Sequence, residues 1–224
     1  MDFFGKNKTT GQILISALMA AVSLFVNGLG VYLTVHANIG AAPWDVLNLG
    51  LSKTFHILYG NASIAVSLCI LIIDILLREH IGIAMFIDAF TVGKAVDFFD
   101  WLDIVPVPKT LFGSIAMILV GLVIIGYTQM LYMKAALGCG PRDTLLVGLS
   151  RRVPKIPIGA VSIALLSAAT LTGWLLGGPV GIGTILCAFA SGPIMQAAFM
   201  SVKFDATGIR HQKIHESVKV ILGK

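Results

Sequence analysis

Long apolar runs alternate with short polar segments along most of this chain. Five such runs cover about residues 12–35, 61–77, 110–133, 157–176 and 180–200. At 1.5 Å per residue, each run is long enough to cross a hydrocarbon core of about 30 Å. A sixth run, from about 81 to 99, has the same length but contains Asp88, Lys94 and Asp97. The pattern predicts an all-α polytopic membrane protein with six transmembrane helices.

Two shorter segments, after the first and fourth runs, are too short and too polar to span. Residues 46–55 follow Pro43-Trp44-Asp45, and residues 144–152 follow Pro141-Arg142-Asp143. Proline suits the first position of a helix, and an aspartate two residues later meets the positive end of the helix dipole. Preceding glycines allow a sharp turn. The sequence therefore predicts two short half-helices, either re-entrant or interfacial.

These two motifs belong to an internal repeat of about a hundred residues. With one extra residue late in the second copy, the equivalent pairs include Gly28 and Gly126, Pro43 and Pro141, Asp45 and Asp143, Gly50 and Gly148, Gly82 and Gly181, and Gly93 and Gly192. The chain is thus predicted to contain a first membrane repeat over residues 1–100 and a second over 110–200. A basic, amphipathic tail follows at 203–224.

The distribution of lysine and arginine predicts the orientation in the membrane. If the N-terminus is cytoplasmic, the outer segments contain only Lys53 and Lys109. The inner segments then contain Lys6, Lys8, Arg78, Lys134, Arg142, Arg151, Arg152, Lys155, Lys203, Arg210, Lys213, Lys219 and Lys224. This bias follows the positive-inside rule and places both termini in the cytoplasm. Because three spans per repeat is an odd number, the second repeat is expected to be inverted relative to the first.

Composition narrows the class of protein further. The chain is 57% hydrophobic and 12% charged, with a mean hydropathy of +0.92, whereas about a quarter of a soluble domain is charged. The net charge of +5 comes without the basic-aromatic pattern of a nucleic-acid groove. Three widely spaced cysteines form no disulfide framework or zinc motif. No hydrolase or nucleotide-binding motif is present, so we expect no enzyme activity, cofactor or metal.

Ionisable residues inside a span cost about 2.5–3.5 kcal/mol each on insertion scales, which makes them candidates for function. Lys94 and Asp97 are three residues apart and can form an ion pair, either as a structural lock or as part of a site. Asp88 would then face the interior, and Gln196 of the second repeat could complete the site. Asp74, near the end of its span, is expected to reach the interface.

The paired motifs offer two interpretations. Asp45 and Asp143 could simply begin their helices, or they could line a pathway together with Arg142, as broken helices do in inverted-repeat transporters. The two copies differ beside the aspartate, where Trp44 stands in one and Arg142 in the other.

The two motifs, their spacing and the six-span pattern resemble the YczE/YitT-like family of bacterial integral membrane proteins over residues 10–200. YitT relatives carry an additional soluble C-terminal domain, so the YczE branch is the closer resemblance. This resemblance implies a multi-pass protein of the bacterial cytoplasmic (inner) membrane and implies no particular substrate.

Two functions remain open from the sequence. The first is transport of a small solute or ion through a midplane site at the interface of the repeats, with the lipid bilayer as the surrounding partner and a homo-oligomer compatible with it. The alternative is a non-transporting accessory factor, whose basic inner loop and tail dock a cytosolic partner or lipid.

Overall fold

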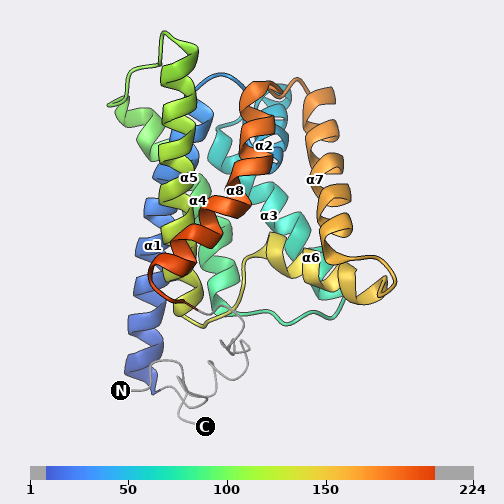
Figure 1. The fold of residues 1–224 in the computed structure, drawn as a ribbon. Helices are drawn as coiled ribbons and strands as arrows, with labels where there is room; N and C mark the ends of the chain where they lie inside the picture. Colours follow the sequence, from blue (N-terminus) through green and yellow to red (C-terminus); the bar gives the residue numbers. More distant parts are fainter. Residues whose placement is uncertain (1–8, 205–224) are drawn as a thin grey trace.

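The computed structural model describes residues 9–204, which fold into eight α-helices without a strand (Figure 1). The helices are α1 (Thr10–His36), α2 (Pro43–Phe55), α3 (Tyr59–Leu76), α4 (Ile83–Leu102), α5 (Leu111–Lys134), α6 (Pro141–Arg152), α7 (Ile158–Leu175) and α8 (Ile182–Ser201). Five of them, α1, α3, α5, α7 and α8, are long and apolar enough to cross a membrane. The prediction of an all-α membrane protein in contact with a lipid bilayer is therefore confirmed.

Helix α4 is the sixth predicted span. Its 20 residues give it sufficient length, but Asp88, Lys94, Asp97 and Asp100 make it too charged to be counted with the other five. The predicted amphipathic tail lies outside the described residues, apart from its first two positions.

Helices α1 and α5 form the most extensively packed pair of the bundle. They lie side by side and run in opposite directions in Figure 1. Their backbones approach closely at Gly30 and Gly121, since a methyl group on Gly30 would lie 2.8 Å from the Gly121 carbonyl oxygen. Nearby, the Asn27 side-chain amide donates a buried hydrogen bond of 2.9 Å to the Thr128 hydroxyl. Small residues and interhelical hydrogen bonds are the usual means of helix association in lipid.

Helices α2 and α6 are the two predicted half-helices. They contain 13 and 12 residues, about 20 Å at most, and begin at Pro43 and Pro141 as predicted. The turns before them use Gly40 and Gly138, whose φ angles of 108° and 124° suit glycine. In Figure 1, α2 lies near the top of the bundle and α6 near the bottom. Neither helix can cross a bilayer alone.

The other helices pack in corresponding ways in the two halves of the chain, with one exception. Helix α4 packs on α1 and α8 on α5, while α2 packs on α7 and α6 on α3. Helix α3 also packs on α4, but α7 and α8 form no comparable contact and stand apart in Figure 1. Backbone hydrogen bonds from Gly183 to Ile39 (2.7 Å) and from Ala84 to Leu137 (3.2 Å) fix the loops before α2 and α6.

Candidate functional site

The two sequence motifs meet inside the bundle. The guanidinium carbon of Arg142, at the start of α6, lies 5.2 Å from the ring centroid of Trp44, at the start of α2. This is a cation–π contact, a type worth about 0.5–2 kcal/mol depending on its solvation. Trp44 and Arg142 are equivalent positions of the two motifs. The arginine forms no hydrogen bond or ion pair within residues 9–204, so its donors remain available to a ligand or water.

The carboxylate of Asp45 lies on one side of this pair. Asp45 is 5% exposed, and its Oδ1 accepts a hydrogen bond of 2.7 Å from the Tyr59 hydroxyl of α3. The Tyr59 oxygen accepts in turn from the Asn48 amide, at 3.2 Å. Asn48 is fully buried, and its own carbonyl oxygen has no partner among the described residues. These contacts hold Asp45 in a fixed orientation next to α3.

The carboxylates of Asp88 and Asp143 lie on the other side. An Oδ2 atom of Asp88 is 2.7 Å from the position that a methyl group on Gly140 would take, so α4 approaches the start of α6 closely there. Asp143 is exposed and accepts a hydrogen bond of 3.3 Å from the Gln129 amide of α5. Arg142 interacts electrostatically with Asp45, Asp88 and Asp143, although each pair is beyond direct contact.

We call the group formed by Trp44, Asp45, Asp88, Arg142 and Asp143 the central cluster. It gathers four of the seven charged or polar residues that the sequence proposed as a pathway. Sequence reasoning missed its supporting residues Asn48 and Tyr59. It also missed Tyr132, a buried residue whose hydroxyl has no hydrogen-bond partner among the described residues. Across the described part of the chain, no three His, Cys, Asp or Glu side chains are grouped as metal ligands.

Lys94 and Asp97 belong to a second, separate cluster. The Lys94 ammonium lies 3.6 Å from the Asp97 carboxylate, which agrees with the predicted ion pair, and it donates a hydrogen bond of 2.7 Å to Asn61 of α3. Asp97 Oδ1 also accepts from the Gly60 amide at 2.7 Å. The Lys94 side chain is 52% exposed, so this pair is not the deeply buried one that the sequence suggested.

The second cluster borders a cavity of about 730 Å³, formed by the ends of α1, α2, α3 and α4. Tyr59 also lines this cavity. Because the Tyr59 hydroxyl bonds Asp45, this tyrosine stands between the cavity and the central cluster.

Two other predicted residues lie elsewhere. Gln196 is exposed on α8 and forms no hydrogen bond within residues 9–204, so the structure does not bring it to the central cluster. Asp74 is 0% exposed, and neither of its carboxylate oxygens has a hydrogen-bond partner in the described chain. The expectation that the Asp74 side chain reaches the interface is therefore wrong, because Asp74 lies on the buried face of α3.

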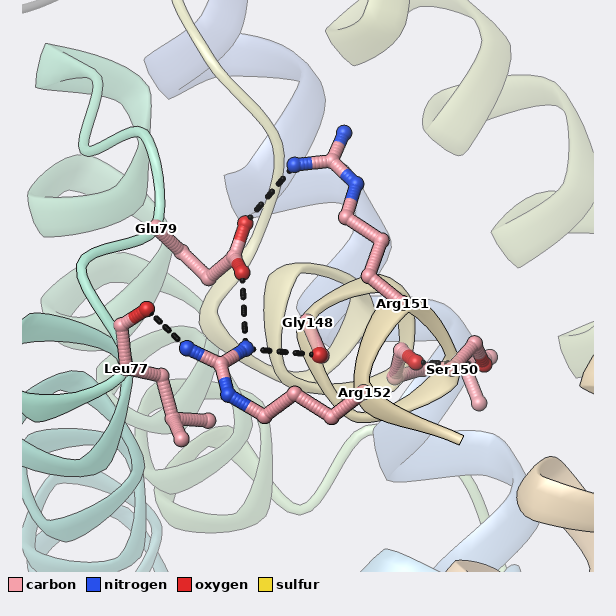
Figure 2. A network of polar contacts seen from close by, with 7 residues as sticks. Leu77, Glu79, Gly148, Ser150, Arg151 and Arg152 are labelled. Atoms are coloured by element: carbon pink, nitrogen blue, oxygen red, sulfur yellow. Dashed lines mark hydrogen bonds and ion pairs between the residues drawn. The ribbon is translucent and has the colours of Figure 1, made fainter. Parts of the chain in front are cut away.

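A third polar group joins the end of α3 to the end of α6 (Figure 2). Glu79, whose side chain is 8% exposed, pairs with Arg151 at 3.0 Å and with Arg152 at 3.1 Å. Arg152 also donates to the carbonyl oxygens of Gly148, at 2.7 Å, and of Leu77. Two of the basic side chains at the end of α6 are thus bound to the protein itself.

Comparison with known proteins places these clusters in a family. Residues 14–200 match the family described as "Family of unknown function (DUF6198)". The chain belongs to this family. The match begins in the second turn of α1 and ends one residue before the end of α8. It therefore includes all three polar groups described above.

Curated bacterial relatives of this DUF6198 protein include a membrane protein. The chain is 32% identical over 179 residues to the "Uncharacterized membrane protein YczE" of Bacillus subtilis, covering 77% of this chain and 80% of the relative. It is 31% identical over 182 residues to an "Uncharacterized protein" of Haemophilus influenzae, with 81% of each chain covered. The predicted kinship with YczE is confirmed, as is a multi-pass membrane protein with bacterial homologues.

A third relative is the "Uncharacterized protein YyaS" of Bacillus subtilis. It is 28% identical over 194 residues, which cover 80% of this chain and 94% of the relative. No solved structure matches this chain.

Proposed function

We propose that this protein is a non-enzymatic transporter of a small cation or small polar solute, and that the central cluster is its binding site. The contact between Trp44 and Arg142 carries the proposal. Two equivalent residues touch each other only near the axis that relates two repeats, and substrate sites of inverted-repeat transporters lie there, between broken helices. Three carboxylates against one guanidinium favour a positively charged ligand over an anion.

Pairs of equivalent contacts support an inverted repeat with six spans, α4 included. The bond from Gly183 to Ile39 corresponds to the bond from Ala84 to Leu137. The backbone hydrogen bond from the Gly178 amide to the Gly173 carbonyl corresponds to that from the Glu79 amide to the Asp74 carbonyl. At the ends of α2 and α6, the Thr54 hydroxyl donates to Leu176 at 3.0 Å, while the equivalent Arg152 donates to Leu77. Such agreement is expected of one unit used twice about a pseudo-twofold axis.

The lysine and arginine bias supports cytoplasmic termini, with α2 on the outer side and α6 on the inner side. Reporter fusions after residue 55 and after residue 224 test this orientation. We expect the reporters to indicate opposite sides of the cytoplasmic membrane. If both indicate the same side, α2 or α4 has been assigned to the wrong part of the bilayer and the repeats are not inverted.

Asp88 tests the binding site directly. The purified protein is heated in detergent with sodium, potassium, methylammonium, glycine or acetate, and its unfolding temperature is measured. We expect a cation or zwitterion of this set to raise the unfolding temperature by about 2 °C or more, since a ligand stabilises the state that binds it. Asp88→Asn should remove this shift while the ligand-free unfolding temperature stays within about 2 °C of wild type.

Asp100→Asn is the matched control, because it alters a carboxylate of the same helix outside the central cluster. It should keep the shift. A shift that survives in Asp88→Asn, or no shift with any of the five probes, contradicts this site. The accessory-factor hypothesis would then be preferred, although its inner-loop residues Arg151 and Arg152 are already paired with Glu79.

A further inference from the structure

Helices α3 and α4 are locked together by a glycine pair. A methyl group on Gly93 would lie 2.9 Å from the Gly60 carbonyl oxygen and 3.1 Å from Ser63 Cβ, so the two backbones are nearly in contact. Asp97 adds the hydrogen bond from the Gly60 amide, and Lys94 adds the one to Asn61. We call this arrangement the first seam.

The second copy of the sequence repeats the parts of this seam. Gly60, Ser63, Gly93 and Asp97 correspond, at a constant offset of 99 residues, to Gly159, Ser162, Gly192 and Gln196. The glutamine side chain retains a carbonyl oxygen that can accept a hydrogen bond as Asp97 does. We call the corresponding faces of α7 and α8 the second seam.

The second seam is open in this structure. A methyl group on Gly159 or on Gly192 would have no atom of another helix within 4 Å. Gln196 is exposed and has no hydrogen-bond partner within residues 9–204. Equivalent residues of the two repeats therefore form a closely packed helix pair in α3 and α4 and a separated helix pair in α7 and α8.

The aspartates of the two motifs, Asp45 and Asp143, also differ from each other, one being buried and the other exposed. Asp45 is 5% exposed, and its carboxylate is held by the hydroxyl of Tyr59, which begins α3 beside Gly60 of the closed first seam. Asp143 is exposed, and its side-chain hydrogen bond comes from Gln129 of α5 and not from α7. Closure of the first seam thus goes together with burial of Asp45, and opening of the second seam goes together with exposure of Asp143.

We infer that this structure is one of two states and that the second state exchanges the arrangements of the two seams. In that state Gly159 packs on Gly192, Gln196 accepts the Gly159 amide, the first seam separates, and the exposures of Asp45 and Asp143 are exchanged. This inference deepens the proposed transport, since it gives the central cluster access from one side at a time. Lys94 and Asn61 have no polar equivalents, because Pro193 and Ala160 replace them. This difference favours the state seen here.

A disulfide trap detects the second state without any substrate. In full-length protein lacking Cys69, Cys139 and Cys187, Ser162→Cys and Gly192→Cys are combined and oxidised mildly in native membranes. Their first-seam equivalents have Cβ positions 3.1 Å apart, close to the separation of about 3.5–4.5 Å that a disulfide needs. We expect the disulfide to form slowly. Leu171→Cys with Gly192→Cys is the control and should not form it, because position 171 lies about 14 Å along α7 from position 162.

Asp97→Ala then tests whether the two seams are coupled. This change removes the acceptor of the Gly60 amide and weakens only the first seam. A hydrogen bond to a charged group is strong enough that its loss should raise the rate of second-seam disulfide formation about tenfold. Asp100→Ala, which removes an exposed carboxylate one turn further along α4, should leave the rate unchanged.

The outcomes separate this inference from the proposed function. No disulfide between positions 162 and 192 in either background, or a rate that Asp97→Ala does not change, overturns the exchange of seams even if a cation is found to bind. A disulfide whose rate rises with Asp97→Ala supports the exchange, even if none of the five probes stabilises the protein and the proposed ligand class is wrong.

Discussion

The two short helices begin alike but are held in place differently. Helix α2 lies directly on the backbone of α7, since a methyl group on Gly173 would be 2.5 Å from Leu47 Cα. Helix α6 is held at the end of α3 by side chains, through the contacts of Glu79 with Arg151 and Arg152 (Figure 2) and through apolar contacts of Leu145. Close packing is insensitive to salt and resists displacement, whereas partly exposed ion pairs are weaker and screened.

The difference has a cause in the sequence. Gly173 and Gly178 of the second copy stand where the first copy has Asp74 and Glu79. Glycines let α2 approach α7 without a side chain between them, while the larger Glu79 lies between the end of α3 and Gly148 of α6. The half-helix that carries Arg142 and Asp143 is therefore the more loosely held one.

Gly173→Ala should give the largest effect. Its methyl group would overlap the backbone of α2 at Val46 and Leu47, which cannot move aside as a flexible side chain would. We expect a loss of about 3 kcal/mol in the free energy of unfolding, the upper part of the range for overpacking. The measurement is unfolding of the purified protein in detergent. Gly159→Ala is the control and should not destabilise, because its methyl group enters open space. Equal stabilities would show that α2 does not dock on α7 by backbone contact.

The parts of this fold that the sequence predicted depend on local chemistry. Proline at the first helical position and glycine before it determined where α2 and α6 begin, and run length determined the membrane helices. The pair of Lys94 with Asp97 was predictable for the same reason, since residues three apart share one helical face.

The parts that were missed depend on the approach of distant segments. The sequence pattern does not predict that the Tyr59 hydroxyl donates a hydrogen bond to Asp45. Nor does it predict that Asp97 accepts a hydrogen bond from the Gly60 amide in addition to pairing with Lys94. Asp74 was misplaced because hydropathy alone does not tell which face of α3 is covered. One signal was available. Gly60 and Ser63 recur as Gly159 and Ser162, and this repetition would have marked the seams.

Glu79→Gln should give a smaller effect than Gly173→Ala and tests the other half-helix. The change removes the charge that both Arg151 and Arg152 contact, while Arg152 keeps its bonds to the carbonyl oxygens of Leu77 and Gly148. Hydrogen bonds to charged groups are worth about 1.5–3 kcal/mol, and the exposure of both arginines reduces this. We therefore expect a loss of about 1–1.5 kcal/mol in the free energy of unfolding, measured in detergent at low salt.

Arg151→Gln is the matched control for this network. The Arg151 side chain is 63% exposed and contacts Glu79 alone, so its loss should cost about 0.5 kcal/mol and should disappear at high salt. The test is whether Glu79→Gln lowers the free energy of unfolding more than Arg151→Gln does. If Arg151→Gln costs as much as Glu79→Gln, then Arg152 contributes nothing through Glu79, and α6 is held by a single ion pair. If neither change has an effect, the ion pairs of Glu79 do not hold α6, and its apolar contacts with α3 and α7 hold it instead.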